Sequence, residues 1–427
     1  MMSRPVLNRP RHLFVSPSSH SKPSSATLHV RVLPLFLALA FLPAIVVGQD
    51  RPDPAATARL HFGPLAATPT IGLSNLGVDT NVFNQVADPK RDFTATVSPQ
   101  VQFWIRLGKG RLSGNTRLDY VYFNHYATER AMNTHNEVRV EFPLNRLIPY
   151  VTESFVGARE RPGYEIDTRS RRKENTLTLG TDVRVRTKTS IGFAAWRFNV
   201  SFNASDSFAG SYLSEVLNRT ADGFRVSVRH KLTPLTTLVL DGEAQRDRFA
   251  SPSVRNRNAN SVRVMPGISL DRFALISGSA RVGYRKYDTL GPGAPGFRGL
   301  VAATDLGYTL LGVTRFSIHT ERDLAYSFDV SSPYYVQTGV TGTVTQRVSS
   351  QWDVQGTAGH FRLDYRHIGG VVAGRQDNLF TVGAGAGYRL GPTTRVGVNV
   401  DNYRRRSDRN AREYDGLRVG MSVTYGP

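Results

Sequence analysis

The 427-residue sequence contains no cysteine, and after its first fifty residues it has no apolar run long enough to cross a membrane as a helix. Without cysteine, a disulfide framework and a cysteine-ligated zinc site are both excluded. Apolar residues make up only 40% of the chain. These absences exclude a small disulfide-stabilised scaffold and a bundle of transmembrane helices.

Lysine is also scarce, with 7 lysines beside 47 arginines, and the formal net charge is +20. A strong positive charge can indicate nucleic-acid binding, but only where the basic residues form a patch or a stripe. Here they are scattered singly along alternating segments, so we expect no nucleic-acid partner. Two explanations of the arginine excess stay open. One is a GC-rich coding sequence, and the other is selection for a planar group that binds carboxylates, phosphates and sugar hydroxyls.

The clearest pattern lies in residues 92–122. Apolar and polar side chains alternate strictly from Phe93 to Leu107, Gly108-Lys109-Gly110 reverses the chain, and the alternation resumes as far as Tyr122. Strands in soluble proteins are usually about five or six residues long. Strands of about ten residues or more, with one apolar face and one polar face, are typical of transmembrane β-barrels. The hairpin therefore predicts a membrane protein that spans the bilayer with strands.

Similar segments recur along the chain, and their number is even. The eighteen predicted strands are 65–79, 93–107, 111–122, 136–142, 148–158, 174–186, 190–202, 222–232, 236–248, 260–270, 274–287, 298–310, 314–327, 334–346, 351–365, 377–390, 393–405 and 414–425.

The connections between these segments alternate in length. Tight turns such as 187–189 and 311–313 alternate with longer polar loops such as 159–173 and 203–221. Outer-membrane barrels have this arrangement, with short turns in the periplasm and long loops outside. We therefore predict an all-β fold, a single antiparallel up-and-down transmembrane β-barrel of 18 strands, with 16 as the alternative. A soluble β-sandwich or propeller would not need such long strands.

The two ends of the chain carry separate signals. Residues 1–48 combine a basic leader with an apolar core and small residues before Gln49, which predicts a secretory signal peptide. Residues 49–59 are rich in proline and alanine and are expected to be a short periplasmic tether, which leaves 60–427 for the barrel. The last segment, 414–425, resembles the C-terminal strand that the barrel-insertion machinery recognises in bacteria.

If the apolar register contacts lipid, the opposite register lists the candidate pore-lining side chains. Arginines outnumber acids in this register, so we expect an anion-favouring potential inside the barrel. Pairing with facing acids, as a brace for the wall, is an equally good interpretation of any single arginine. The run Gly383 to Gly387 is expected to leave space inside. The candidate pore-lining residues are Arg106, Arg117, Arg139, Arg184, Arg186, Arg225, Arg229, Arg263, Arg281, Arg285, Arg395 and Arg418.

Few residues are candidates for catalysis or metal binding. His319 and Glu321 share the inner register, but no nucleophile stands beside them in a recognisable arrangement, so we expect no enzyme. Asp79, Asn81 and Asp88 could form a cation site in a loop, although polar turn residues are the commoner explanation. We expect no metal and no cofactor.

Several segments resemble one known family. These are Leu76-Gly77-Val78-Asp79-Thr80-Asn81-Val82-Phe83, residues 159–172 (RERPGYEIDTRSRR), residues 277–287 (SGSARVGYRKY), and residues 322–328 with Tyr334-Tyr335-Val336. They resemble the putative β-barrel porin type 2 family, whose members are outer-membrane barrels often found with genes for exopolysaccharide synthesis and export. Segment 159–172 is the most distinctive of them, and no mechanism is attached to it. Its matching residues are Arg159, Arg161, Glu165, Asp167, Arg169 and Arg171.

The resemblance implies an outer-membrane location and export of a polysaccharide, either an exopolysaccharide or a capsule. Because the tether is too short to cross the periplasm, a separate periplasmic export protein is an expected partner, in addition to lipid and lipopolysaccharide. Two alternatives stay open: a general diffusion porin for small anions, and a structural or adhesive barrel whose surface loops bind ligands.

Overall fold

The computed structural model describes residue 55, residues 58–369 and residues 374–426. The predicted signal peptide, 1–48, lies outside these residues, and so does most of the predicted tether, 49–59. Both stay predictions. No helix in the described segments is long and apolar enough to span a membrane.

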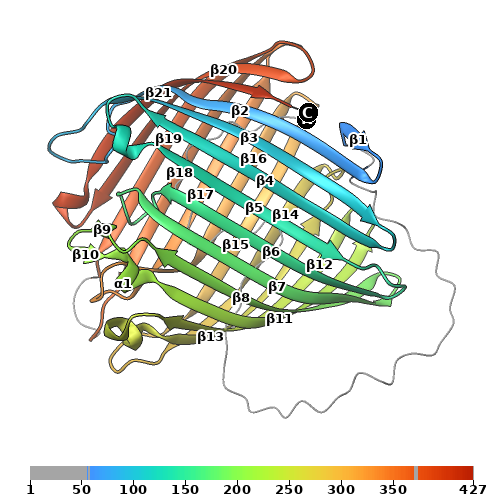
Figure 1. Cartoon of the computed structure of the whole chain (residues 1–427), viewed down its shortest axis with the longest axis horizontal. Helices are drawn as coiled ribbons and strands as arrows, with labels where there is room; N and C mark the ends of the chain where they lie inside the picture. The colour runs from blue at the N-terminus through green and yellow to red at the C-terminus, as the bar shows by residue number, and fades with distance from the viewer. Residues whose placement is uncertain (1–54, 56–57, 370–373, 427) are drawn as a thin grey trace.

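Eighteen long antiparallel strands within the described residues form one closed barrel (Figure 1). Each strand pairs with the next along the chain, and the first pairs with the last, with Ile71 opposite Tyr425 and Asp79 opposite Arg418. Closure gives each of these eighteen described strands a partner on both sides, as the bilayer core requires. The predicted count of eighteen is confirmed, and the alternative of sixteen is wrong.

The eighteen barrel strands are β2 (Leu65–Asp79), β3 (Asp92–Leu107), β4 (Gly110–Phe123), β5 (Ala131–Glu141), β6 (Leu147–Glu160), β7 (Ser170–Arg186), β8 (Thr189–Phe202), β11 (Arg219–Thr233), β12 (Thr236–Phe249), β13 (Ala259–Leu270), β14 (Ile276–Thr289), β15 (Phe297–Leu310), β16 (Thr314–Tyr326), β17 (Tyr334–Arg347), β18 (Trp352–Arg366), β19 (Gln376–Arg389), β20 (Thr394–Ser407) and β21 (Tyr414–Tyr425).

Short elements lie outside the barrel wall or in its connections. β1 pairs with the start of β2, and β9 pairs with β10 in the connection that leads to β11. The short elements are β1 (Leu60–Phe62), β9 (Ser207–Phe208), β10 (Ser211–Tyr212), α1 (Leu213–Leu217), η2 (Ala127–Glu129), η3 (Pro252–Arg257) and η4 (Asn410–Arg412).

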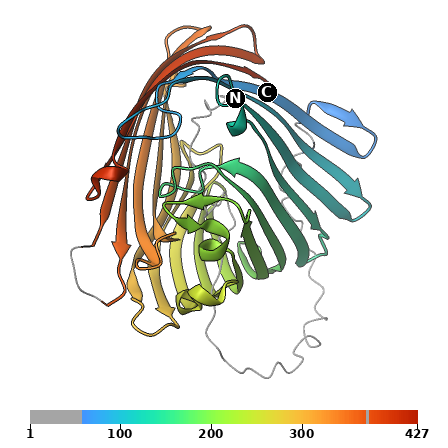
Figure 2. The ribbon, with the colours of Figure 1, turned by 60° about the vertical axis from the view of Figure 1, so that its left-hand side comes forward.

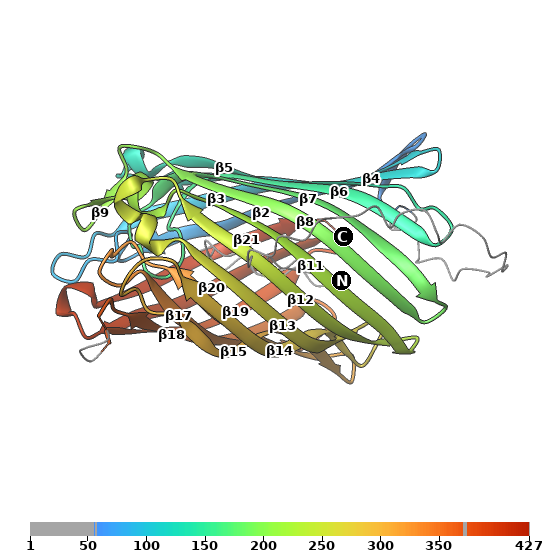
Figure 3. The ribbon, with the colours of Figure 1, turned by 90° about the horizontal axis from the view of Figure 1, so that it is seen from below.

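The two ends of the barrel differ (Figures 1 and 3). One end carries tight turns, such as Gly108-Lys109 between β3 and β4, together with the start of β2 and the end of β21. The other end carries the longer loops, α1 and the 3-10 helices. This alternation was predicted, and it places the short turns in the periplasm and the long loops outside.

The strands are longer than the bilayer requires. They have 11 to 17 residues, whereas a tilted strand crosses the hydrocarbon in about nine to eleven. At the loop end of β8 the usual pattern is inverted, because Phe198 and Val200 are buried inside while Arg197 and Asn199 face outward. The loop ends of the strands therefore stand beyond the lipid, where the outer face contacts water.

The lipid-facing register can be tested by placing a charge in it. Val101 lies near the middle of β3. It is half-exposed on the outer face, and so are Phe93 and Leu107 at the two ends of the strand. Replacing Val101 with arginine is expected to cost roughly 2 to 4 kcal/mol of folding free energy, because the charge enters the bilayer midplane. Urea unfolding of the barrel refolded in lipid vesicles measures this cost.

Gln102 is the matched control for that substitution, because it neighbours Val101 and is exposed on the inner face. Thr96 and Ser98 also face inward but are buried, and the Ser98 hydroxyl donates to Asp119 at 2.6 Å, so an arginine there would disturb packing as well. Equal losses for Val101→Arg and Gln102→Arg would mean that the faces are assigned wrongly.

Candidate functional site in the barrel lumen

Eleven of the twelve candidate arginines lie in the inward-facing register, and at least nine of these form ion pairs with described carboxylates. The expectation is wrong for Arg186, because a bulge in β7 after Arg184 places it opposite Thr189, in the outward register. Because each of the nine guanidinium groups has a carboxylate partner, most of the positive charge predicted for the lumen is locally compensated. The nine pairs are Arg117–Asp119 (2.6 Å), Arg139–Glu141 (3.1 Å), Arg225–Glu243 (3.0 Å), Arg229–Asp182 (2.7 Å), Arg263–Glu243 (2.5 Å), Arg281–Asp241 (3.2 Å), Arg285–Asp323 (2.6 Å), Arg395–Asp353 (2.5 Å) and Arg418–Asp79 (2.7 Å).

Some of these pairs join into a chain across neighbouring strands. Glu243 on β12 accepts from Arg225 on β11 and Arg263 on β13, and Asp323 on β16 accepts from Arg263 and from Arg285 on β14. A buried charge is tolerated when it is paired and hydrogen-bonded. The interpretation of the arginines as braces for the wall therefore describes this part of the lumen well.

The remaining three candidates, Arg106, Arg184 and Arg186, lie toward the short-turn end. Arg106 stands opposite Arg111 in the β3–β4 pair. Arg184 and Arg186 have no ion pair with any described residue, and the nearby Asp182 is engaged by Arg229. Among these three, Arg184 is therefore the inward-facing arginine without an ion pair in the described residues, and it lies near the periplasmic end of the lumen.

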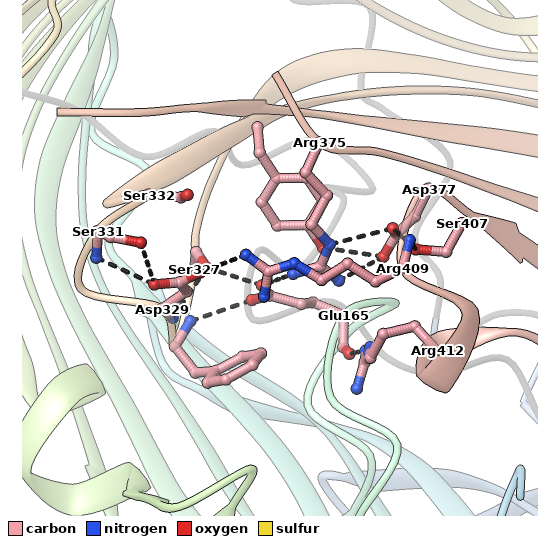
Figure 4. A network of polar contacts seen from close by, with 12 residues as sticks. Glu165, Ser327, Asp329, Ser331, Ser332, Arg375, Asp377, Ser407, Arg409 and Arg412 are labelled. Carbon is pink, nitrogen blue, oxygen red and sulfur yellow. Dashed lines mark hydrogen bonds and ion pairs between the residues drawn. The ribbon is translucent and has the colours of Figure 1, made fainter. Parts of the chain in front are cut away.

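The loop between β6 and β7 crosses the lumen at the opposite end. We call residues 161–169 the crossing loop. Its Glu165 is 1% exposed and reaches the β16–β17 connection on the far side of the ring of strands, where its carboxylate accepts from the Ser327 hydroxyl at 2.7 Å and the Phe328 N–H at 3.1 Å (Figure 4). A guanidinium nitrogen of Arg375 lies 3.7 Å from the same carboxylate. Burial raises the pKa of Glu165 above its ordinary value, against the opposing effect of Arg375.

Further contacts tie the crossing loop to other parts of the wall. The Asp167 carboxylate accepts from Arg405 at 2.6 Å and lies 3.2 Å from Arg412, which also donates to the Glu165 carbonyl. On the β2–β3 connection, the Val82 carbonyl accepts from Arg161 at 2.7 Å and from Arg169 at 3.0 Å. The crossing loop is thus held from three sides.

A second connection also folds inward at this end (Figure 2). In the segment between β8 and β11, Leu213 and Leu217 of α1 are fully buried. The buried guanidinium of Arg257, at the end of η3, donates to the Val216 carbonyl at 2.8 Å and to the carbonyls of Ser327 and Pro333. One side chain therefore joins three connections.

These connections enclose an apolar core inside the loop end of the barrel. Its buried members include Ile166 of the crossing loop, Leu213 of α1, Phe198 of β8 and Tyr326 of β16. The sequence predicted strands whose polar face lines the lumen, and at this end apolar side chains take that place. The physical reason is that the strands continue beyond the bilayer, where their inner faces pack against loops.

The glycine run on β19 leaves less space than predicted. A Cβ on Gly383 would lie 2.2 Å from an Asp401 carboxylate oxygen, and one on Gly387 would lie 2.1 Å from the Arg395 guanidinium. The missing side chains therefore make room for large side chains of the neighbouring strand β20, which lie flat against the wall.

A cavity of about 150 Å³ lies between the crossing loop and the wall formed by β17 to β21. Thr357 and Asp401 also line a second space of about 40 Å³, which extends along the same wall to Gly385 and Arg395, toward the short turns. The first cavity combines aromatic rings, hydroxyls and charged groups. Its main lining side chains are Arg161, Tyr164, Asp167, Arg169, Thr341, Thr357, Phe361, Thr381, Asp401, Tyr403, Tyr414 and Arg418.

The other residues of the family segment have simple contacts. Arg159 pairs with Glu129 at 2.9 Å, and Arg171 pairs with Asp206 at 2.7 Å on the exposed side of β7. Arg161, Glu165, Asp167 and Arg169 belong to the crossing loop itself. Segment 159–172 thus contains both the loop and its attachment to the wall.

The weaker candidates do not assemble into catalytic or metal sites. The His319 ring lies 3.9 Å from Glu321 on the wall. Asp79 is engaged by Arg418, Tyr403 and the Asn81 N–H, whereas Asp88 pairs with Lys90. Within the described ranges no group of three or more His, Cys, Asp or Glu side chains could hold a metal ion.

The sequence did not single out the arginines that hold the crossing loop, namely Arg257, Arg375, Arg405 and Arg412. The acids of the family segment were a partial signal, because carboxylates that fold into a barrel need cationic or hydrogen-bonding partners. Which of the 47 arginines supply them depends on contacts across as many as 247 residues.

A closed antiparallel barrel with a half-exposed apolar outer belt and a charged inner face defines an outer-membrane channel protein. Residues 60–426 match the family described as Putative beta-barrel porin 2. The chain belongs to this family. It is an outer-membrane transport barrel and not an enzyme, as predicted.

Solved structures with similar folds are remote in sequence. OpdK from Pseudomonas aeruginosa, solved with vanillate, has 11% identity and a TM-score of 0.46 over 84% of this chain and 98% of its own. OpdQ from the same organism has 8% identity and a TM-score of 0.45 over 85% and 97%. The siderophore receptor PirA, also from P. aeruginosa, has 9% identity and a TM-score of 0.41 over 85% and 80%. The search of curated proteins gave no match.

Proposed function

We propose that this barrel is an outer-membrane pore for the export of a polysaccharide, an exopolysaccharide or a capsule. The observation that carries the proposal is the wall from β17 to β21, where cavities next to the crossing loop combine threonine hydroxyls, aromatic rings, arginines and aspartates. Such a lining offers donors and acceptors for sugar hydroxyls. An eighteen-strand barrel is also wide enough to enclose an aqueous channel.

The crossing loop supports this function in a second way. A pore wide enough for a polymer would let other solutes through when idle, so it needs a closure. Residues 161–169 are held across the lumen by contacts with the β16–β17 connection, with β20 and with the β2–β3 connection. We therefore propose that the crossing loop is the closure and that it moves when polymer passes.

The main alternative is a general diffusion porin for small anions. Arg184 favours it, because uncompensated charge in a confined lumen raises the local anion concentration. The third candidate, a structural or adhesive barrel, would leave the lumen permanently closed. Reversal potentials across a salt gradient in planar bilayers test the porin alternative, since a porin for anions gives anion-selective current and cation selectivity would count against the charge argument. An adhesive barrel would give no current even after Glu165→Ala has released the crossing loop.

The export proposal includes a partner. A periplasmic export protein would bind the short-turn end, where Lys109, Lys188 and Asp271 are exposed in three separate turns. The barrel-insertion machinery would bind β21, and lipopolysaccharide and lipid would surround the outer face.

Deleting the gene is expected to abolish surface polysaccharide while leaving its synthesis intact, so that polymer accumulates inside the cell. Complementation with an Arg184→Ala/Arg186→Ala variant should restore less export than the wild type, because the inward-facing charge of Arg184 would attract an anionic polymer into the periplasmic end. Staining of surface polysaccharide and assay of the intracellular polymer measure both effects.

The matched control for this variant is Arg225→Ala/Arg229→Ala, since both of these arginines are bound by carboxylates. This control variant should lower the stability of the barrel more than it changes the anion selectivity of the channel. A deletion strain that exports normal polymer but loses uptake of small anions would establish the porin alternative instead.

A further inference from the structure

The cavity beneath the crossing loop has the size of one sugar ring. Its volume is about 150 Å³, and an apolar cavity of about 150 Å³ in another protein accommodates benzene, a single six-membered ring. It therefore suits one residue of a polymer and is too small for several.

Aromatic rings line two parts of this cavity. The rings of Tyr164 and Phe361 lie 4.2 Å apart at an angle of 32°, and those of Tyr403 and Tyr414 lie 6.2 Å apart. The first pair joins the crossing loop to β18, and the second joins β20 to β21. Large flat side chains provide apolar contact area, which suits the C–H face of a pyranose ring, while Thr341, Thr357 and Thr381 supply hydroxyls.

The charges in the cavity are not evenly compensated. Arg418 is paired with Asp79 at 2.7 Å, and Asp167 is paired with Arg405 at 2.6 Å. Arg161, by contrast, donates to the Asp167 and Val82 carbonyls and has no ion pair with a carboxylate in the described part of the chain.

Arg169 reinforces this imbalance. It donates to the same Val82 carbonyl as Arg161, so the two guanidinium groups converge on one oxygen, and its nearest carboxylate is Glu129 at 3.3 Å. Burial and, second, the charge of Arg161 lower the pKa of Arg169 to about 9. Glu129 is shared with Arg159 at 2.9 Å, so Arg159, Arg161 and Arg169 have one paired carboxylate among them.

On the wall of the cavity Asp401 carries the opposite charge and accepts from the Asn399 amide at 2.8 Å. The positive excess therefore lies on the side of the crossing loop, where it favours an anion.

We infer that this cavity is a binding subsite for one carboxylate-bearing sugar residue, with the carboxylate on Arg161 and Arg169 and the ring against the aromatic side chains. A guanidinium group is suited to this task because its planar donors match the two oxygens of a carboxylate. The inference deepens the proposed function and depends on it for the polymer, since it names an acidic polysaccharide as the cargo.

The test uses the whole barrel, refolded in detergent, and isothermal titration with a trisaccharide of galacturonic acid. Replacing Arg161 with glutamine, which keeps a donor but removes the charge, is expected to weaken binding at least tenfold. Arg171→Gln is the matched control, because Arg171 is on the exposed side of β7 and is bound by Asp206, and it should bind like the wild type. Heat-modifiable gel mobility confirms that each variant is folded.

Two further ligands identify the chemistry. Maltotriose, a neutral trisaccharide, should bind at least tenfold more weakly, and acetate should compete only at much higher concentration. Equal binding of maltotriose, equal competition by acetate, or unchanged binding by Arg161→Gln would each overturn the inference. If Arg161→Gln does not fold, Arg161→Lys and Arg169→Gln replace it, and normal binding by both would overturn the inference equally.

The result is separable from that of the gene deletion. If binding depends on Arg161 but deletion of the gene leaves export intact, the subsite is supported and the export function is wrong. If deletion abolishes export but the barrel does not bind the uronate, the export function is supported and the subsite is wrong.

Discussion

Replacing Glu165 with alanine is expected to open the channel. The substitution removes the acceptor for the Ser327 hydroxyl and the Phe328 N–H and the anionic neighbour of Arg375. Both donors are buried, and leaving a buried donor without an acceptor costs about 1 to 3 kcal/mol. Losing the acceptor of both should shift the equilibrium between closed and open crossing loop by at least about 2 kcal/mol, which is roughly thirtyfold. Single-channel recording in planar bilayers measures the open fraction.

A cysteine probe shows whether the crossing loop itself moves. The chain has no cysteine, so Ile166→Cys introduces a single thiol at a position that is 1% exposed. The thiol should react slowly with a charged maleimide in the otherwise wild-type barrel and quickly in the Glu165→Ala background. A higher current without faster labelling would place the gate elsewhere, and no change in either would mean that Glu165 does not hold the closure.

The same carboxyl group gives the closed state a pH dependence. Burial raises the pKa of Glu165 in the closed loop above the ordinary value of 4.5, although Arg375 and Arg412 oppose the shift. The closed state therefore binds the proton more tightly than an open loop would. Its extra stability is fully present below pH 4.5 and is lost as the pH rises through the raised pKa. Glu165→Gln should stay closed and lose this dependence.

Replacing Arg257 with alanine is expected to loosen the whole loop end. Its guanidinium donates to the carbonyls of Val216, Ser327 and Pro333 and lies 4.7 Å from the centre of the Phe249 ring. The Pro333 carbonyl also accepts from the Ser327 N–H at 3.2 Å, but leaving the buried Val216 and Ser327 carbonyls without this donor costs about 1 to 3 kcal/mol each. The local loss should therefore be at least about 2 kcal/mol, and hydrogen exchange of Leu213 and its neighbours in α1 should rise steeply.

Arg255 supplies the control for Arg257. It lies on the same short helix, η3, but is exposed, and replacing it with alanine should change stability by no more than about 0.5 kcal/mol. The strand amides in the membrane should stay protected in both variants, since the barrel ladder does not depend on Arg257. If Arg257→Ala leaves exchange in α1 unchanged, the buried contacts do not stabilise the inward-folded connections.

Sequence reasoning reached the barrel because the pattern that builds it is local. Alternation through segments such as Phe93 to Leu107 fixes which side chains face lipid, and turns such as Gly108-Lys109-Gly110 fix where the chain reverses. Eighteen strands with alternating connections follow from these two signals. One predicted start is wrong, because β5 begins at Ala131 and not at residue 136. Met132, which precedes the predicted start, already belongs to the strand and is exposed on its outer face.

The sequence by itself therefore determined the class of fold, the faces of the strands and the inner register of the candidate arginines other than Arg186, because each depends on neighbours along the chain or on a period of two. Arg186 lies past a bulge, which changes the register. Tertiary structure alone decided which arginines are compensated, since Arg263 meets Asp323 across 60 residues. It also decided that the crossing loop lies in the lumen. Glu165 is stable there only because Ser327 and Arg375, which are remote in sequence, converge on it once the barrel has closed.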